Sequence, residues 1–146
     1  MRDGRRWIWA ALVLQLVGYV YDGLWHGVLN PGLEPTTTAG MARHLATVHL
    51  PLYLGAASVL VATVTTLLRR NAGSPGGLAL VIAVAGAILS AGAEAWHAHD
   101  HLHLDTHTAP LAGGLSVVGF LVVVGATWLS SRGLRPTASA FAKPRH

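Results

Sequence analysis

Histidines and carboxylates are concentrated in residues 94–107, which read Glu-Ala-Trp-His-Ala-His-Asp-His-Leu-His-Leu-Asp-Thr-His. These fourteen residues hold five of the nine histidines and three of the six carboxylates of the chain. Neutral imidazole together with carboxylate suits Zn(II), Cu(II), Fe(II) or Ni(II). The segment therefore indicates a metal site, a proton-carrying or hydrogen-bonding network, or a hydrated loop that is rich in histidine.

Helical spacing brings other polar residues of the chain onto common faces. Asp22 and His26 are four residues apart, so they share one face of a helix that Gln15 and Tyr19 extend inward. A second face follows the same three-to-four spacing through Ser90, Glu94, His97 and His101. His49 enters the next helix about one turn from its outer end, with Tyr53 one turn deeper, so several helices bring histidines to one layer.

The cost of burying such groups favours a bound cation. Asp near the centre of a membrane helix costs about 3 kcal/mol even on the lenient insertion scale. Two buried carboxylates, Asp22 and Glu94, would also repel each other or force one to protonate. A cation between them relieves both penalties, so we predict one or two divalent transition metal ions, copper, zinc or iron. The candidate ligands are Asp22, His26, His44, His49, Glu94, His97, His101, His103 and His107.

We expect these candidates to differ in depth. Asp22, His26, His49, Glu94 and His97 should form one inner cluster, whereas His99 and His103 should lie farther out. His44, His101 and His107 belong near the mouth of the site. Two alternatives remain open at this point: a metal-free hydrogen-bond network, and one haem b held between His26 and His97.

The composition predicts an all-α integral membrane protein. Of the 146 residues 52% are hydrophobic and 11% are charged, whereas a soluble domain carries about a quarter charged residues. Four apolar runs, approximately 7–29, 45–68, 78–100 and 108–131, each approach the ~20 residues that cross a bilayer as a helix. We expect one membrane domain, an up-down four-helix bundle over residues 1–146, with residues 132–146 as a tail and the lipid bilayer as its environment.

The basic residues predict the orientation. Nine of the ten fall at the two termini and in the second loop, and only Arg43 falls on the other side. By the positive-inside rule both termini are cytoplasmic in a plasma (inner) membrane, and the histidines face outward. This distribution accounts for the basic excess without a nucleic-acid partner. A homo-oligomer or a larger membrane complex remains open.

The two halves of the chain are similar in pattern. A shift of 59 residues places residues 44–55 over residues 103–114, and six of twelve positions match. A shift of 71 residues places Trp25 and His26 on Trp96 and His97. We therefore predict a tandem duplication of a two-helix unit, with a longer first outer loop. The third helix is rich in small residues and should be the central one.

Three known kinds of metal site resemble parts of this pattern. Glu94-x-x-His97 resembles the Glu-x-x-His element of di-iron carboxylate bundles, although only one copy is present. His44-x4-His49, His97-x3-His101 and His103-x3-His107 resemble in spacing the histidine boxes of membrane desaturases and hydroxylases, which face the cytoplasm. Asp22-x3-His26 is similar to the copper site in the C subunit of particulate monooxygenases.

Metal binding for copper or zinc handling or sensing is the first functional hypothesis. A membrane metalloenzyme with oxidative or hydrolytic chemistry is the second, and it requires an open coordination position and a general base. A haem-binding redox subunit and an accessory subunit of a larger complex are further alternatives. There is no cysteine and no methionine cluster, which argues against a Cu(I) carrier.

The predicted orientation can be tested with reporter fusions. A fusion at Ser74 should report the cytoplasm and one at His103 the opposite side, because the basic residues flank the first position. A cytoplasmic signal from position 103 would contradict the outward-facing site.

Overall fold

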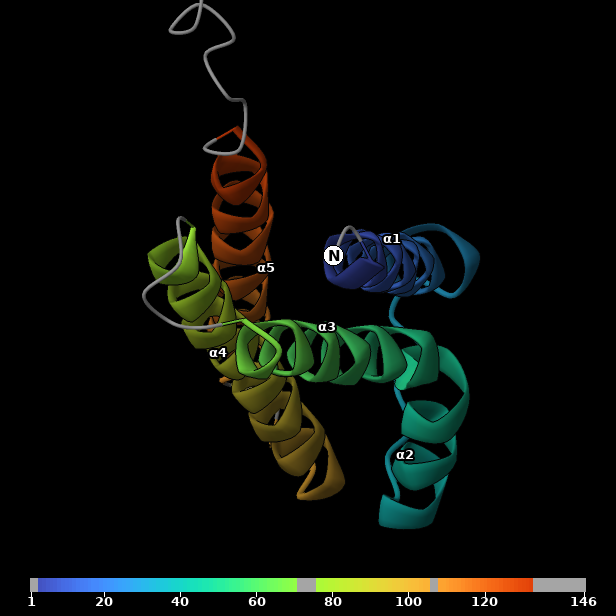
Figure 1. Ribbon diagram of the computed structural model, residues 1–146. Helices are drawn as coiled ribbons and strands as arrows, with labels where there is room; N and C mark the ends of the chain where they lie inside the picture. Colours follow the sequence, from blue (N-terminus) through green and yellow to red (C-terminus); the bar gives the residue numbers. More distant parts are fainter. Residues whose placement is uncertain (1–2, 71–75, 106–107, 133–146) are drawn as a thin grey trace, which may run out of the picture.

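The computed structural model describes residues 3–70, 76–105 and 108–132, and over these residues it contains helices joined by loops and no strand (Figure 1). The first helical stretch is α1 (Asp3–Leu24), which continues into the π-helical segment η1 (Trp25–Leu29). The second stretch combines α2 (Thr38–His44), the π-helical segment η2 (Leu45–His49) and α3 (Leu50–Leu68). The last two are α4 (Gly77–Leu102) and α5 (Ala109–Arg132).

The four helical stretches are each long and apolar enough to cross a membrane. They cover Gly4–Leu29, Thr38–Leu68, Gly77–Leu102 and Ala109–Ser131. The most apolar windows of the second and third stretches are each 39% buried, compared with 28% for the first and last. The small-residue helix α4 is therefore central as predicted, but it shares this position with α3.

The second helical stretch begins at Thr38, not near residue 45 as the apolar run suggested. Thr37 has extended backbone angles, and its hydroxyl accepts a hydrogen bond from the Gly40 amide at 3.1 Å. A threonine in this position satisfies one of the unpaired amides of a helix start. The extra helix α2 carries His44 at its end, so the cap helps to determine where that histidine lies.

The helices are associated as two antiparallel pairs. In the first pair Gly4 of α1 lies beside Thr66 of α3, and Gly18 of α1 lies beside Leu52 of α3. In the second pair Gly119 of α5 lies beside α4. Figure 1 shows the α1–α3 pair crossing the α4–α5 pair, with α3 against α4. This arrangement does not establish the predicted up-down bundle or the predicted tandem duplication, and both remain predictions.

Glycines permit the closest contacts within each pair. A Cβ atom on Gly18 would lie 2.5 Å from the Leu52 Cα, and one on Gly55 would lie 2.4 Å from the Gln15 Cα. In the second pair a Cβ on Gly119 would lie 2.6 Å from the Gly86 carbonyl oxygen. Small residues let membrane helices approach in this way, so that van der Waals packing can hold them together.

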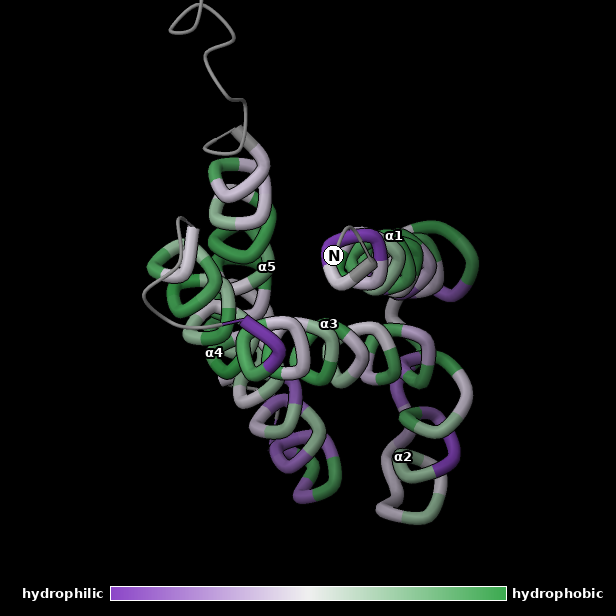
Figure 2. The backbone as a smooth tube through the Cα atoms, in the orientation of Figure 1, coloured by the Kyte–Doolittle hydropathy of each residue, from purple (hydrophilic) through white to green (hydrophobic). Residues whose placement is uncertain are grey.

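The buried face of α1 is apolar near the start of the helix and polar farther along. It begins with Ile8 and Leu12, which belong to an apolar cluster with residues of α3, α4 and α5, and continues with Gln15. The buried face of α4 follows the same order, since its apolar residues precede Ser90 and Glu94. Figure 2 shows hydrophilic residues at the basic start of α1 and end of α3, and again along the last turns of α4.

A hydrogen-bonded layer separates the apolar cluster from the histidines. The Gln15 side-chain amide donates to the Ser90 hydroxyl at 2.7 Å and to the Tyr19 hydroxyl at 3.0 Å. The Ser116 hydroxyl of α5 lies 2.6 Å from that of Tyr19 and 3.1 Å from that of Ser90. These bonds connect α1 with both helices of the second pair, and so fix how the two pairs meet.

Substitution of Gly55 should separate α1 from α3. We expect Gly55→Ala to destabilise the protein by about 1–3 kcal/mol, the usual cost of overpacking, because the new methyl group meets backbone atoms. Gly125→Ala in α5 is the matched control, since open space surrounds that position. Thermal unfolding in one detergent measures both variants, and equal midpoints would contradict the packing described here.

Candidate metal centre

A proline and a π-helical turn position two of the histidines. Pro51 has no amide hydrogen and its ring clashes with the preceding turn, which kinks a helix. The segment directly before it is η2, and the Thr47 hydroxyl donates to the Arg43 carbonyl at 2.9 Å. Figure 1 shows the result, because α2 turns away from the direction of α3.

The π-helical turn changes which residues share a face. In an α-helix, residues five apart diverge by about 140° around the axis. A π-turn instead bonds residue i to residue i+5, so that such residues lie on nearly the same side. His44 and His49 are five apart, and their ring centroids are separated by 5.1 Å. The second π-helical segment, η1, carries His26.

Five histidines form one cluster around His49, which is only 1% exposed. From its ring centroid, those of His26, His97 and His101 are each 5.5 Å away, and that of His44 is slightly closer. The surrounding rings come from η1, α2 and α4. His49 is therefore the point at which the two helix pairs meet in this layer.

The cluster contains two groups of three histidines that can hold a metal ion. The first is His26, His44 and His49, and the second is His49, His97 and His101. Within each group the available ligand atoms all lie within 4.8 Å of one another. His49 belongs to both groups.

Each group includes a pair of Nε2 atoms at a distance suited to one ion. The Nε2 atoms of His26 and His44 are 3.4 Å apart, and those of His97 and His101 are 3.0 Å apart. Two nitrogens bound to one tetrahedral ion at 2.0–2.1 Å would be separated by about 3.3 Å, and by about 2.9 Å for a right angle at the ion. Both pairs are therefore close to a chelating geometry.

Carboxylates lie beside the first group and beneath the cluster. The Asp22 Oδ1 atom is 3.0 Å from the His49 Nδ1 atom and 3.7 Å from the His26 Nε2 atom. Glu94 is 4% exposed, belongs to neither group of three, and lies within electrostatic range of Asp22 and Tyr53. The Tyr53 ring stacks on His49 with a centroid distance of 5.8 Å and an interplanar angle of 17°.

Several polar atoms at the centre of the cluster are buried and have no hydrogen-bond partner among the residues that the structure describes. They include both ring nitrogens of His49, the Asp22 Oδ1 atom and the Tyr53 hydroxyl. The contact between Asp22 and His49 has the distance of an ion pair but not the alignment of a hydrogen bond. A buried polar group without a partner costs about 1–3 kcal/mol, so the cluster is costly for the chain alone.

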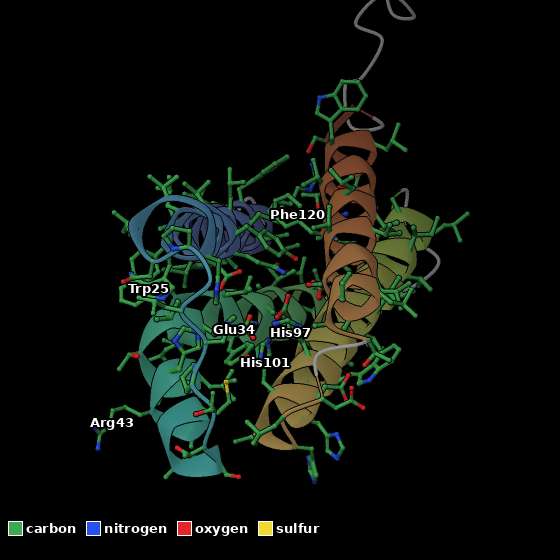
Figure 3. All side chains as sticks on the ribbon, turned by 180° about the vertical axis from the view of Figure 1, so that it is seen from behind. Trp25, Glu34, Arg43, His97, His101 and Phe120 are labelled. Atoms are coloured by element: carbon green, nitrogen blue, oxygen red, sulfur yellow. The ribbon has the colours of Figure 1, made fainter. Side chains whose placement is uncertain are left out.

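Two further residues lie next to the cluster, and helical spacing did not identify either of them as part of the site. Glu34 of the first loop interacts electrostatically with His44 and His101, and Figure 3 shows it beside His101. The Trp25 ring centroid is 6.3 Å from that of His44. Arg43, in contrast, points outward from α2 in Figure 3.

The outer histidines lie apart from the cluster. The His99 and His103 rings stack on each other at 4.1 Å, and both residues are exposed. The His103 Nδ1 atom lies 2.8 Å from the His99 carbonyl oxygen, where it can donate a hydrogen bond. Next to them, the buried Asp100 carboxylate accepts a short hydrogen bond from Thr108 at the start of α5. His107 lies outside the described residues.

The structure changes the expected ranking of the candidates. Asp22, His26, His49 and His97 come together as predicted, and His103 lies farther out. His44 and His101, expected near the mouth, belong to the two groups of three, whereas Glu94 belongs to neither. The repeat had made His44 equivalent to His103, yet only His44 reaches the cluster.

The geometry thus defines an all-helical, membrane-type protein with histidine groups that can hold a metal ion. No protein-family model matches the chain, and neither do the curated proteins or the solved structures with which it was compared.

Chemical modification can test this division between inner and outer histidines. Diethyl pyrocarbonate should modify His99 and His103 much faster than His49 and His101 in the folded protein, because the inner rings are at most 4% exposed. Mass spectrometry of proteolytic fragments measures each rate. Rates that become equal only after unfolding would support the arrangement, and equal rates in the folded protein would contradict it.

Proposed function

We propose that this protein is a transition-metal-binding membrane protein whose centre holds two ions that share His49. One ion would be bound by the His26 and His44 pair and the other by the His97 and His101 pair. Asp22 is the nearest carboxylate and would balance charge at the first ion. The single observation that carries this proposal is the buried, unpartnered His49 ring between two chelating Nε2 pairs.

A hydrogen-bond network without metal accounts less well for the same atoms. It would pair His26 with His44 and His97 with His101, but among the described residues it leaves the His49 nitrogens without a hydrogen bond, although Nδ1 lies at ion-pair distance from Asp22. A metal ion bound to those nitrogens would remove this cost and would also attract the carboxylates of Asp22 and Glu94. Binding of this kind adds to the stability of the fold, because a ligand that binds only the folded chain stabilises it.

The ligand chemistry favours zinc or Cu(II), with Fe(II) as a further possibility for this donor set. Imidazole suits all three metals, and the chain has no cysteine thiolate that would select Cu(I). A haem is less compatible with the geometry. His49 lies 5.5 Å from both His26 and His97 and so fills the space that a porphyrin between them would need.

The proposed role is the handling or sensing of copper or zinc at the extracytoplasmic face of the plasma membrane. Two features support the orientation: the positive-inside distribution of basic residues, and the separation of arginines and histidines at opposite ends of α1. The buried apolar cluster between the histidines and the arginines also favours exchange with one side only.

A membrane metalloenzyme is the second candidate, and one observation favours it. Glu94 is buried and Tyr53 is half-buried next to the metal groups, and the buried Tyr53 hydroxyl has no hydrogen-bond partner among the described residues. Bound metal would lower the pKa of a water ligand, and Glu94 could then serve as the general base of a hydrolytic reaction. Glu94→Gln separates the two roles, because it should retain metal in either case but remove activity only in an enzyme.

Measuring the metal content of a set of variants tests whether His49 is a ligand of both ions. Protein purified without a histidine tag should contain up to two zinc or copper ions per chain by elemental analysis. His49→Ala should reduce affinity at both positions by tenfold or far more, as expected for loss of a ligand. His26→Ala and His97→Ala should each retain one ion, because each disrupts only one Nε2 pair.

His99→Ala is the matched control, since its ring stacks on His103 away from the cluster. It should keep full metal content. If His99→Ala loses metal while His49→Ala retains it, the site belongs to the outer loop. A protein that neither contains nor takes up zinc or copper would overturn the proposed function.

A further inference from the structure

Two arginines at the opposite end of α1 from the histidines have no acidic partner among the side chains that the structure describes. Arg5 of α1 and Arg70, which follows α3, are close enough to repel each other. The Arg5 Nη2 and Arg70 Nη1 atoms are buried and lack a hydrogen-bond partner. Neither residue forms a salt bridge within the part of the chain that the structure describes. Like charges held in this way favour binding of an anion.

An apolar groove begins at Gly4 and Arg69, which directly precede these two arginines in the chain, although neither Arg5 nor Arg70 is among its lining residues. It has a volume of about 610 Å³ and runs between α1 and α3, with Gly4 and Arg69 at its basic end. Trp7, Leu14 and Leu54 form part of its walls, and all three are exposed. The groove lies on helices that are apolar enough to be surrounded by lipid, so its natural occupant is a hydrocarbon chain.

We propose that this groove binds an anionic phospholipid, with one acyl chain between α1 and α3 and the phosphate held by Arg5, Arg69 and Arg70. Arginine presents several donors in a planar arrangement that matches phosphate oxygens. Basic pockets at the cytoplasmic ends of membrane helices bind lipid head groups in this manner. The site is independent of the metal centre, because it lies at the other end of the same helix pair.

Charge distinguishes this occupant from a second protein helix or a neutral lipid. The groove is apolar for most of its length, but Arg69 lines one end, and Arg5 and Arg70, which repel each other, are the chain neighbours of the residues at that end. A neutral lipid or an apolar helix would fill the groove and leave these positive charges without an anion. An anionic lipid satisfies both parts of the surface with one molecule.

Thermal unfolding of the full-length protein in a neutral detergent tests the proposal. Phosphatidylglycerol should raise the unfolding midpoint, whereas phosphatidylcholine with the same chains and inorganic phosphate should not. Arg5→Gln and Arg70→Gln should each weaken phosphatidylglycerol binding roughly fivefold, the effect of about 1 kcal/mol per arginine. Without lipid, Arg5→Gln should leave the midpoint unchanged or raise it, because it removes a repulsion.

Two matched controls separate this site from general charge and size effects. Arg43→Gln removes the same charge at the histidine end and should keep the response to phosphatidylglycerol. Ala57→Phe should block the groove and abolish the response, whereas Val118→Phe on the exposed face of α5 should not.

Several results would overturn the proposal. An equal response to phosphatidylcholine would make the groove a general hydrocarbon site, and an equal response to inorganic phosphate would make it a phosphate site. Efficient disulfide formation between two copies of Ser58→Cys in the membrane would show that a second chain fills the groove. An unchanged phosphatidylglycerol response in both Arg70→Gln and Ala57→Phe would exclude the site even if Arg5→Gln fails to fold.

Discussion

The structure depends on burial of one imidazole ring, that of His49, at the junction of two helix pairs. A neutral imidazole inside a membrane protein needs partners for both nitrogens, because no bulk water can supply them. Four other histidine rings surround it at 5.1–5.5 Å. Each pair of helices contributes part of this surrounding, so the position of α1–α3 relative to α4–α5 and the geometry of the cluster are determined together.

The remainder of the core provides the rigidity that such a cluster requires. Glycines bring the helices of each pair into backbone contact, and the hydrogen bonds of Gln15, Ser90 and Ser116 join the two pairs. Within the described residues, the Gln15 amide nitrogen and the two serine hydroxyls are satisfied by one another and by Tyr19, whereas the Gln15 Oε1 atom has no partner. The protein thus combines a hydrogen-bonded layer that joins the two helix pairs with a histidine layer in which more of the buried polar atoms lack partners.

The sequence predicted the buried faces well where ordinary α-helical spacing applies. Gln15 and Asp22 on α1, and Ser90 and Glu94 on α4, follow three-to-four spacing, and Gln15, Ser90 and Glu94 are buried as expected. His44 was placed too far out because five residues separate it from His49, and only a π-turn brings the two together. Pro51 was the available signal for that turn, but a proline alone does not specify how a helix will accommodate it.

Helical periodicity could not predict the contacts that loop residues make. Glu34 approaches the cluster from a segment without a repeating pattern, and its position depends on the path of the whole connection. The two halves also differ at this point, since His103 aligns with His44 in sequence but forms a stacked pair with His99 at the helix end. The capping of α2 and the closing of the α4–α5 loop determine this difference.

The apolar cluster of Ile8, Leu12, Val59 and Leu80 has a consequence for permeation. These side chains are at most 2% exposed and fill the bundle between the polar layer and the arginine end. An ion that crossed this region would lose its hydration against a surface that is mostly apolar and to which Thr63 and Thr127 add only buried hydroxyls, so the cluster opposes passage between the two ends of the bundle. If the histidine layer holds metal ions as proposed, those ions would therefore enter and leave from the histidine end.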